Sequence, residues 1–68
     1  MAMIWQRIKA YTEQEGIDYK TIAAKAQLPL QAVTALLGGK EFMEMEVYAR
    51  ICQALEKPFD FFFEYRKL

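Results

Sequence analysis

The chain has 68 residues, of which 54% are hydrophobic and 15% aromatic, and its nine basic residues balance nine acidic ones. This length allows one domain at most, and so short a chain buries only about 60% of the surface that it exposes when unfolded. The composition excludes a disordered tail. The zero net charge argues against a protein that binds nucleic acid regardless of sequence.

The chain has one cysteine, Cys52, and no histidine. An intrachain disulfide is therefore impossible, and neither a zinc site nor histidine-based acid–base catalysis is expected. The first residues lack the basic region and continuous apolar run of a signal peptide. No segment approaches the ~20 apolar residues of a membrane span. We expect a cytoplasmic protein that uses no metal and no cofactor.

The first predicted element is a helix over residues 3–15. Ile4, Ile8 and Tyr11 recur at the i, i+4, i+7 spacing of one helical face. Gly16 follows at the expected C-cap position, where glycine adopts a positive φ without a steric penalty. The helix is therefore expected to end there.

Two short helices follow, over residues 19–26 and 30–37. Asp18 is suited to cap the first, because its carboxylate accepts hydrogen bonds from the unpaired amides of the first turn. Pro29 is suited to begin the second, where its missing N–H costs nothing. The predicted inward-facing residues are Ile22, Ala23, Ala26, Val33, Leu36 and Leu37.

A fourth helix is predicted over residues 44–56, and Pro58 ends it. Its apolar stripe consists of Met45, Tyr48, Ile51, Cys52 and Leu55. A short fifth helix is predicted over residues 59–65, although its three consecutive phenylalanines are equally compatible with a strand. No strand alternation occurs elsewhere, so residues 1–68 are expected to form one all-α domain of five short helices around one core.

The last predicted helix carries five aromatic side chains, more than one face buries in so small a core. Phe59, Phe62 and Phe63 are the expected core residues. Phe61 and Tyr65 would then stay partly exposed and form a self-association surface. The alternative is that these aromatic residues merely cover the open end of the bundle.

The two short helices in the middle of the chain are each about two turns long and are separated by a corner of two or three residues. Such a corner forces a steep crossing, and Ala23 and Ala26 are small enough for the two backbones to approach. This is the helix-turn-helix pattern, in which the outer face of the second helix enters the major groove of DNA.

The stretch IAAKAQLPLQAVTALLGGK, residues 22–40, and the later stretch VYARICQALEKPFDFFF, residues 47–63, carry a wider similarity. Over about residues 4–63 the chain resembles the helix-turn-helix domains of the phage-repressor (Cro-like, XRE) family. The matching positions include Ala23, Leu28, Val33 and Leu36. The resemblance implies a lambda-repressor-like bundle of five helices, with the motif at about residues 19–37.

The chain departs from the family pattern at three places. The turn glycine is Gln27, so either a non-glycine residue adopts a positive φ at some cost or the turn differs. The usual Ser or Thr cap of the recognition helix is Pro29. An arginine and its acidic partner, which form a salt bridge in the family, correspond to Thr12 and Leu37.

The resemblance implies that Leu30, Gln31 and Thr34 face the bases. The Gln31 amide is suited to pair with N6 and N7 of adenine. Thr34 offers its methyl group to thymine or its hydroxyl to phosphate; the alternative is a hydroxyl that bonds back to its own helix. Leu30 suits either a thymine methyl group or a protein partner. The alternative for Gln31 is an ordinary solvated side chain.

Lys20, Thr21 and Lys40 occupy positions where the family contacts phosphate, through the start of the second helix and the loop after the third. A single exposed lysine is usually only solvated, but the two lysines and Thr21 together around one surface favour phosphate binding. Nearby acidic residues would weaken that binding if they lay over phosphates. They are Glu41, Glu44 and Glu46.

The sequence therefore predicts a transcriptional regulator that binds a specific double-stranded DNA operator without a cofactor. A homodimer would place its recognition helices in successive major grooves, roughly 34–36 Å apart. The alternative is a protein-interaction module on the same fold, a partner of another repressor or an antitoxin-like regulator, which zero net charge and Leu30 support. An enzyme is not expected, because the sequence has neither a glycine-rich phosphate loop nor identifiable paired catalytic carboxylates.

Overall fold

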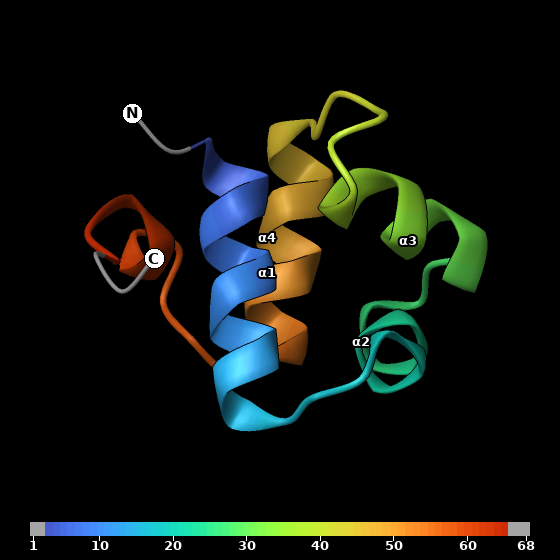
Figure 1. Ribbon diagram of the computed structural model, residues 1–68, viewed down its shortest axis with the longest axis horizontal. Helices are drawn as coiled ribbons and strands as arrows, with labels where there is room; N and C mark the ends of the chain where they lie inside the picture. Colours follow the sequence, from blue (N-terminus) through green and yellow to red (C-terminus); the bar gives the residue numbers. More distant parts are fainter. Residues whose placement is uncertain (1–2, 66–68) are drawn as a thin grey trace.

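The computed structural model describes residues 3–65, and every regular element in that range is helical (Figure 1). The α-helices are α1 (Ile4–Glu15), α2 (Tyr19–Ala26), α3 (Leu30–Leu37) and α4 (Met45–Ala54). A 3-10 helix, η1, covers Phe61–Phe63. The all-α prediction is confirmed, and each α-helix ends within two residues of its predicted limits. The fifth predicted helix is reduced to the single turn of η1.

Local capping explains where α1 ends and α2 begins. Gly16 has a φ of 69°, as its predicted C-cap position requires. The Asp18 carboxylate accepts hydrogen bonds from the Thr21 amide at 2.9 Å and from the Thr21 hydroxyl at 2.7 Å. These two bonds lower the pKa of Asp18, because they favour the ionised carboxylate.

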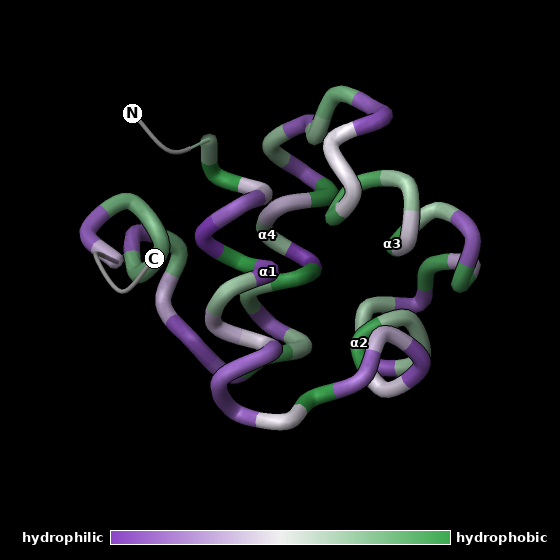
Figure 2. The backbone as a smooth tube through the Cα atoms, viewed as in Figure 1, coloured by the Kyte–Doolittle hydropathy of each residue, from purple (hydrophilic) through white to green (hydrophobic). Residues whose placement is uncertain are grey.

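The helices surround one core. In Figure 1, α2 and α3 lie on one side of α1 and η1 lies on the other. The segment α2 packs on both α3 and α4, while α1 packs on α3 and on η1. Figure 2 shows that each helix carries both polar and hydrophobic residues. The core consists of Ile8, Ile22, Ala23, Val33, Leu36, Leu37, Tyr48, Ile51, Cys52, Leu55 and Phe62.

One predicted core residue of α4 is exposed. Met45 shares a helical face with the buried Tyr48, yet 70% of its surface is accessible. Met45 is the first residue of α4, and the face that it begins is covered only from the next turn onward. Helical periodicity identified the buried face of α4 correctly, but it did not show at which residue the neighbouring elements begin to cover that face.

The prediction for the aromatic residues near the C-terminus is partly wrong. Phe62 is fully buried, but Phe59 is exposed and Phe63 is 48% exposed. In an α-helix these three residues would share one face, whereas the 3-10 turn directs only its middle side chain into the core. Phe61 and Tyr65 are half-buried, and their rings meet the edge of the Tyr11 ring at centroid distances of 5.4 and 5.7 Å.

The positions that carry the family's salt bridge are both buried. Thr12 is 1% exposed, and its hydroxyl donates to the Lys9 carbonyl at 2.8 Å. Leu37 is fully buried. These two residues therefore contribute an uncharged part of the core in place of an ion pair.

The corner between α2 and α3 contains a strained residue. Gln27 has a φ of 58° and a ψ of 45°, so a non-glycine residue adopts the left-handed conformation. Leu28 N–H donates to the Ala23 carbonyl at 2.9 Å, which closes the end of α2. Of the two possibilities that the sequence left open, the strained turn is the observed one.

We expect Gln27→Gly to raise the free energy of unfolding by roughly 0.5–1 kcal/mol. The substitution removes a left-handed penalty of about 1–2 kcal/mol, part of which is offset by the greater freedom of glycine in the unfolded chain. Urea unfolding followed by circular dichroism measures the change. The matched control is Ala24→Gly inside α2, which should lose about 1 kcal/mol. A loss of stability for Gln27→Gly would contradict the interpretation that Gln27 is strained in the left-handed conformation.

Candidate nucleic-acid interface

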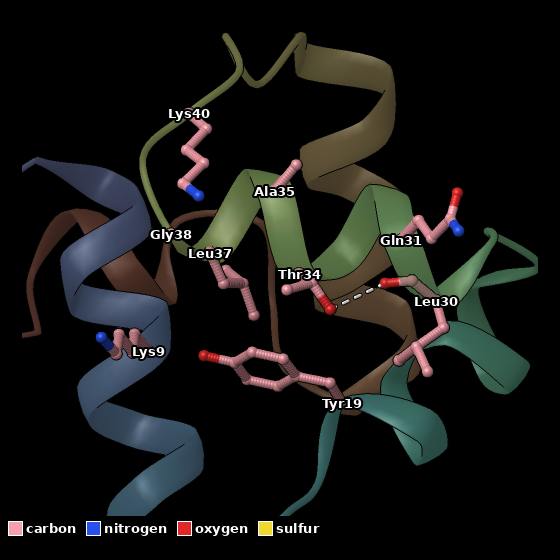
Figure 3. A pocket seen from close by; sticks show the side chains of 9 residues that line it. All are labelled: Lys9, Tyr19, Leu30, Gln31, Thr34, Ala35, Leu37, Gly38 and Lys40. Carbon is pink, nitrogen blue, oxygen red and sulfur yellow. Dashed lines mark hydrogen bonds between the residues drawn. The ribbon is translucent and has the colours of Figure 1, made fainter.

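An open hollow of about 550 Å³ lies along the exposed side of α3, between α1 and the start of α2 (Figure 3). Its lining combines apolar groups with two ammonium groups and contains no carboxylate. The lining residues are Lys9, Tyr19, Leu30, Gln31, Thr34, Ala35, Leu37, Gly38 and Lys40. The hollow therefore has a positive rim over an apolar floor.

The three predicted base-facing residues line this one hollow. Leu30 is 41% exposed, and Gln31 and Thr34 are also exposed. Within residues 3–65, the Gln31 amide makes no hydrogen bond, and Figure 3 shows it pointing away from the Tyr19 ring. It keeps its donors and its acceptor for a binding partner.

The Thr34 hydroxyl is already engaged. It donates to the Leu30 carbonyl at 3.0 Å, one turn earlier in α3 (Figure 3). The expectation that this hydroxyl bonds back to its own helix is confirmed. Because the hydroxyl proton is used there, the methyl group is the part of Thr34 that suits an outside contact.

The three residues expected at phosphates are separated by the structure. Lys40 lines the hollow, whereas Lys20 and Thr21 lie outside its lining at the exposed start of α2. Thr21 gives both its amide and its hydroxyl proton to the Asp18 carboxylate. Neither donor is then available to a phosphate, and the carboxylate adds negative charge at the same helix end.

Two residues of the hollow escaped the sequence analysis. Lys9 comes from α1 and Tyr19 from the first turn of α2. Figure 3 shows the Tyr19 ring lying across the hollow, with its hydroxyl directed toward α1. Burial raises the pKa of Tyr19, and Glu13 adds to the effect. The Tyr19 hydroxyl is therefore protonated at neutral pH and is able to donate a hydrogen bond.

The ion pairs lie away from the hollow. Lys25 is 3.9 Å from Glu56, and Arg50 is 3.6 Å from Glu46. Between residues 3 and 65, no carboxylate forms an ion pair with Lys9 or Lys40. These two ammonium groups keep their charge uncompensated at the hollow.

The predicted self-association residues are Phe61, the first residue of η1, and Tyr65, and η1 lies on the opposite side of α1 from α3 (Figure 1). Besides packing on Tyr11, Tyr65 donates its hydroxyl to Gln14 Oε1 at 2.6 Å. Phe61 and Tyr65 thus close the edge of the bundle, as the alternative interpretation expected. Whether they also contact a second copy stays a prediction.

No family model, no curated protein and no solved structure matches the chain. In the described part of the chain, no helix is both long and apolar enough to cross a membrane. Residues 3–65 also contain no group of three or more potential metal-binding side chains.

Proposed function

We propose that this protein is a transcriptional regulator that binds a specific DNA sequence, with α2 and α3 as its helix-turn-helix and α3 in the major groove. The observation that carries the proposal is the hollow along α3, whose lining contains no carboxylate. There Lys9 and Lys40 flank the exposed side chains of Leu30, Gln31 and Thr34, which we call the reading face. Local positive charge of this kind compensates for the zero net charge of the whole chain.

The dimensions and chemistry of α3 support this use. Eight residues make a helix about 12 Å long, and B-DNA presents a major groove about 12 Å wide. The Gln31 amide suits the N6 and N7 edge of adenine, and Leu30 suits a thymine methyl group. Lys40 lies at the C-terminal edge of the same face, where it suits a phosphate.

We further propose that the regulator acts by occupancy of an operator in the cytoplasm. A two-fold dimer would place two copies of α3 in successive major grooves and would read a palindromic site. Bound there, it would block or recruit polymerase. No cofactor is needed for this mechanism, and no step in it is catalytic.

A second candidate is a protein-interaction module that does not read DNA. The observation that favours it is the apolar floor of the hollow, to which the partly buried Ala35 and the exposed Leu30 contribute. Such a floor is suited to an apolar side chain of another protein.

Selection from a random duplex library at two salt concentrations tests the proposal. We expect a palindromic motif to be enriched, and Gln31→Ala to weaken binding to it by roughly 5- to 100-fold while relaxing the choice of one base. Lys40→Ala should weaken all sequences alike and lower the salt dependence. Gln53→Ala, an exposed glutamine on α4, is the control and should change nothing. The absence of any enrichment at low salt would favour the protein-interaction module.

A further inference from the structure

Exposed apolar side chains gather where the loop between α3 and α4 approaches the start of α1. Phe42 is 86% exposed, Met45 is 70% exposed and Met3 is 60% exposed. Phe42 and Met3 line one hollow of about 280 Å³, together with Ile4, Trp5, Gly39, Lys40, Glu41 and Met43. We call Met3, Trp5, Phe42 and Met43 the apolar patch, in which Met3 and Phe42 are exposed and Trp5 and Met43 are partly buried. Exposed apolar groups concentrated in this way mark an interaction surface.

The loop that carries Phe42 is anchored where it leaves α3. Lys40 N–H donates to the Ala35 carbonyl at 3.0 Å, and Gly39 N–H donates to the Leu36 carbonyl at 3.3 Å. Gly39 also lies directly against the Trp5 ring, so that a Cβ atom there would be 2.5 Å from Cζ2. Phe42 is thus presented to solvent by a loop that is fixed at its base.

Two carboxylates lie beside this patch, both in the segment between α3 and α4. Glu41 lines the hollow, and Glu44 lies between Met43 and Met45 at the N-cap of α4 without making a capping hydrogen bond. Within residues 3–65, neither carboxylate is in an ion pair, whereas Glu46 is paired with Arg50. Lys40 is the one ammonium group in the lining of the hollow. The border of the patch is therefore negative overall.

We propose that the apolar patch binds a basic amphipathic helix of a partner protein. The apolar side chains of the partner helix would pack on Trp5 and Phe42, and the lysines or arginines of that helix would form ion pairs with Glu41 and Glu44. Flexible methionines adapt such a surface to the shape of its ligand. This site shares Lys40 with the hollow along α3 but contains none of Leu30, Gln31 and Thr34, and its occupation requires no DNA.

Charge decides against other occupants. A second copy placed on the patch by a two-fold axis would bring Glu41 and Glu44 close to the same residues of its neighbour. The anionic surface of a membrane would be repelled by the same carboxylates. A basic segment satisfies both the apolar side chains and the negative border.

Trp5 is the only tryptophan of the chain, so its fluorescence reports on the patch directly. The probe is a synthetic 14-residue amphipathic helix of leucine and lysine, compared with a twin that carries glutamate in place of lysine. We expect saturable binding of the basic peptide with a blue shift of Trp5 emission, and roughly tenfold weaker binding of the acidic twin.

Three variants sharpen the test. Phe42→Ser should weaken the basic peptide about tenfold or more, and the pair Glu41→Lys with Glu44→Lys should reverse the preference between the two peptides. Phe63→Ser, which removes an exposed aromatic side chain elsewhere, is the control and should leave binding unchanged. Circular dichroism checks that each variant is folded.

Other results would overturn the proposal. Equal affinity for both peptides, or an unchanged affinity in Phe42→Ser, would show that the patch does not select a basic partner. A dimer in sedimentation that Phe42→Ser dissociates would assign the patch to a second copy. Tighter binding of the protein to anionic than to neutral vesicles, followed by Trp5 fluorescence, would assign the patch to a membrane. None of these measurements depends on DNA binding.

Discussion

Phe62→Ala is expected to lower the free energy of unfolding by about 3–5 kcal/mol, a large part of the total stability. Phe62 is fully buried in the core, and removing a buried phenylalanine side chain costs about 3–5 kcal/mol. A domain of this size has about 3–10 kcal/mol of stability in total, at about 0.05–0.15 kcal/mol per residue. The ring also contacts the Tyr11 ring at 5.5 Å and the Phe61 ring at 4.9 Å between centroids. Urea unfolding followed by circular dichroism measures the loss.

The matched control is the next residue. Phe63 belongs to the same 3-10 turn but is 48% exposed, so Phe63→Ala should cost about 1 kcal/mol or less. The backbone of the turn is held independently of both rings, because Arg7 Nη1 donates to the Phe62 and Phe63 carbonyls at 3.1 and 2.7 Å. Similar losses in the two variants would mean that the aromatic residues act as one cluster rather than through Phe62 alone.

The limits of α2 and α3 were predictable because local chemistry sets them. Asp18 caps α2 through Thr21, three residues away, and Pro29 immediately precedes α3. The 3-10 turn was not predictable in this way. Its carbonyls are bound by Arg7, which is 55 and 56 residues distant in sequence, and no periodic pattern near the C-terminus encodes that contact. Long-range packing therefore decided which phenylalanine enters the core.

The candidate site likewise contains residues that the sequence analysis identified and others that it missed. Leu30, Gln31 and Thr34 lie on the exposed side of α3, the side to which the family resemblance assigned them. Lys9 and Tyr19 reach the hollow only because α1 and α2 pack beside α3. The engagement of Thr21 was visible in principle, since an aspartate three residues before a threonine forms a typical N-cap arrangement.

The segment after α3 connects the two proposed surfaces. Lys40 lines both the hollow along α3 and the hollow over Trp5. Gly39 precedes it, with a φ of 74° and its backbone against the Trp5 ring. The position of this glycine therefore governs Lys40 on one surface and Phe42 on the other, and a change at Gly39 should disturb both.

Gly39→Ala is expected to lower the free energy of unfolding by about 2–5 kcal/mol. Alanine pays about 1–2 kcal/mol to adopt the left-handed conformation, and its Cβ atom would lie 2.5 Å from Cζ2 of Trp5. Relieving such a clash costs a further 1–3 kcal/mol or so, because a packed neighbour must move. Urea unfolding measures the total, and Trp5 fluorescence of the folded variant should shift because the indole is displaced.

Gly16→Ala separates the two causes. Gly16 has a similar φ of 69°, but a Cβ atom there would meet nothing within 4 Å. This variant should therefore lose only the conformational part, about 1–2 kcal/mol, and should leave the Trp5 emission unchanged. Equal losses at the two glycines would mean that Trp5 moves aside freely. In that case the contact with Trp5 would not hold Lys40 and Phe42 in place.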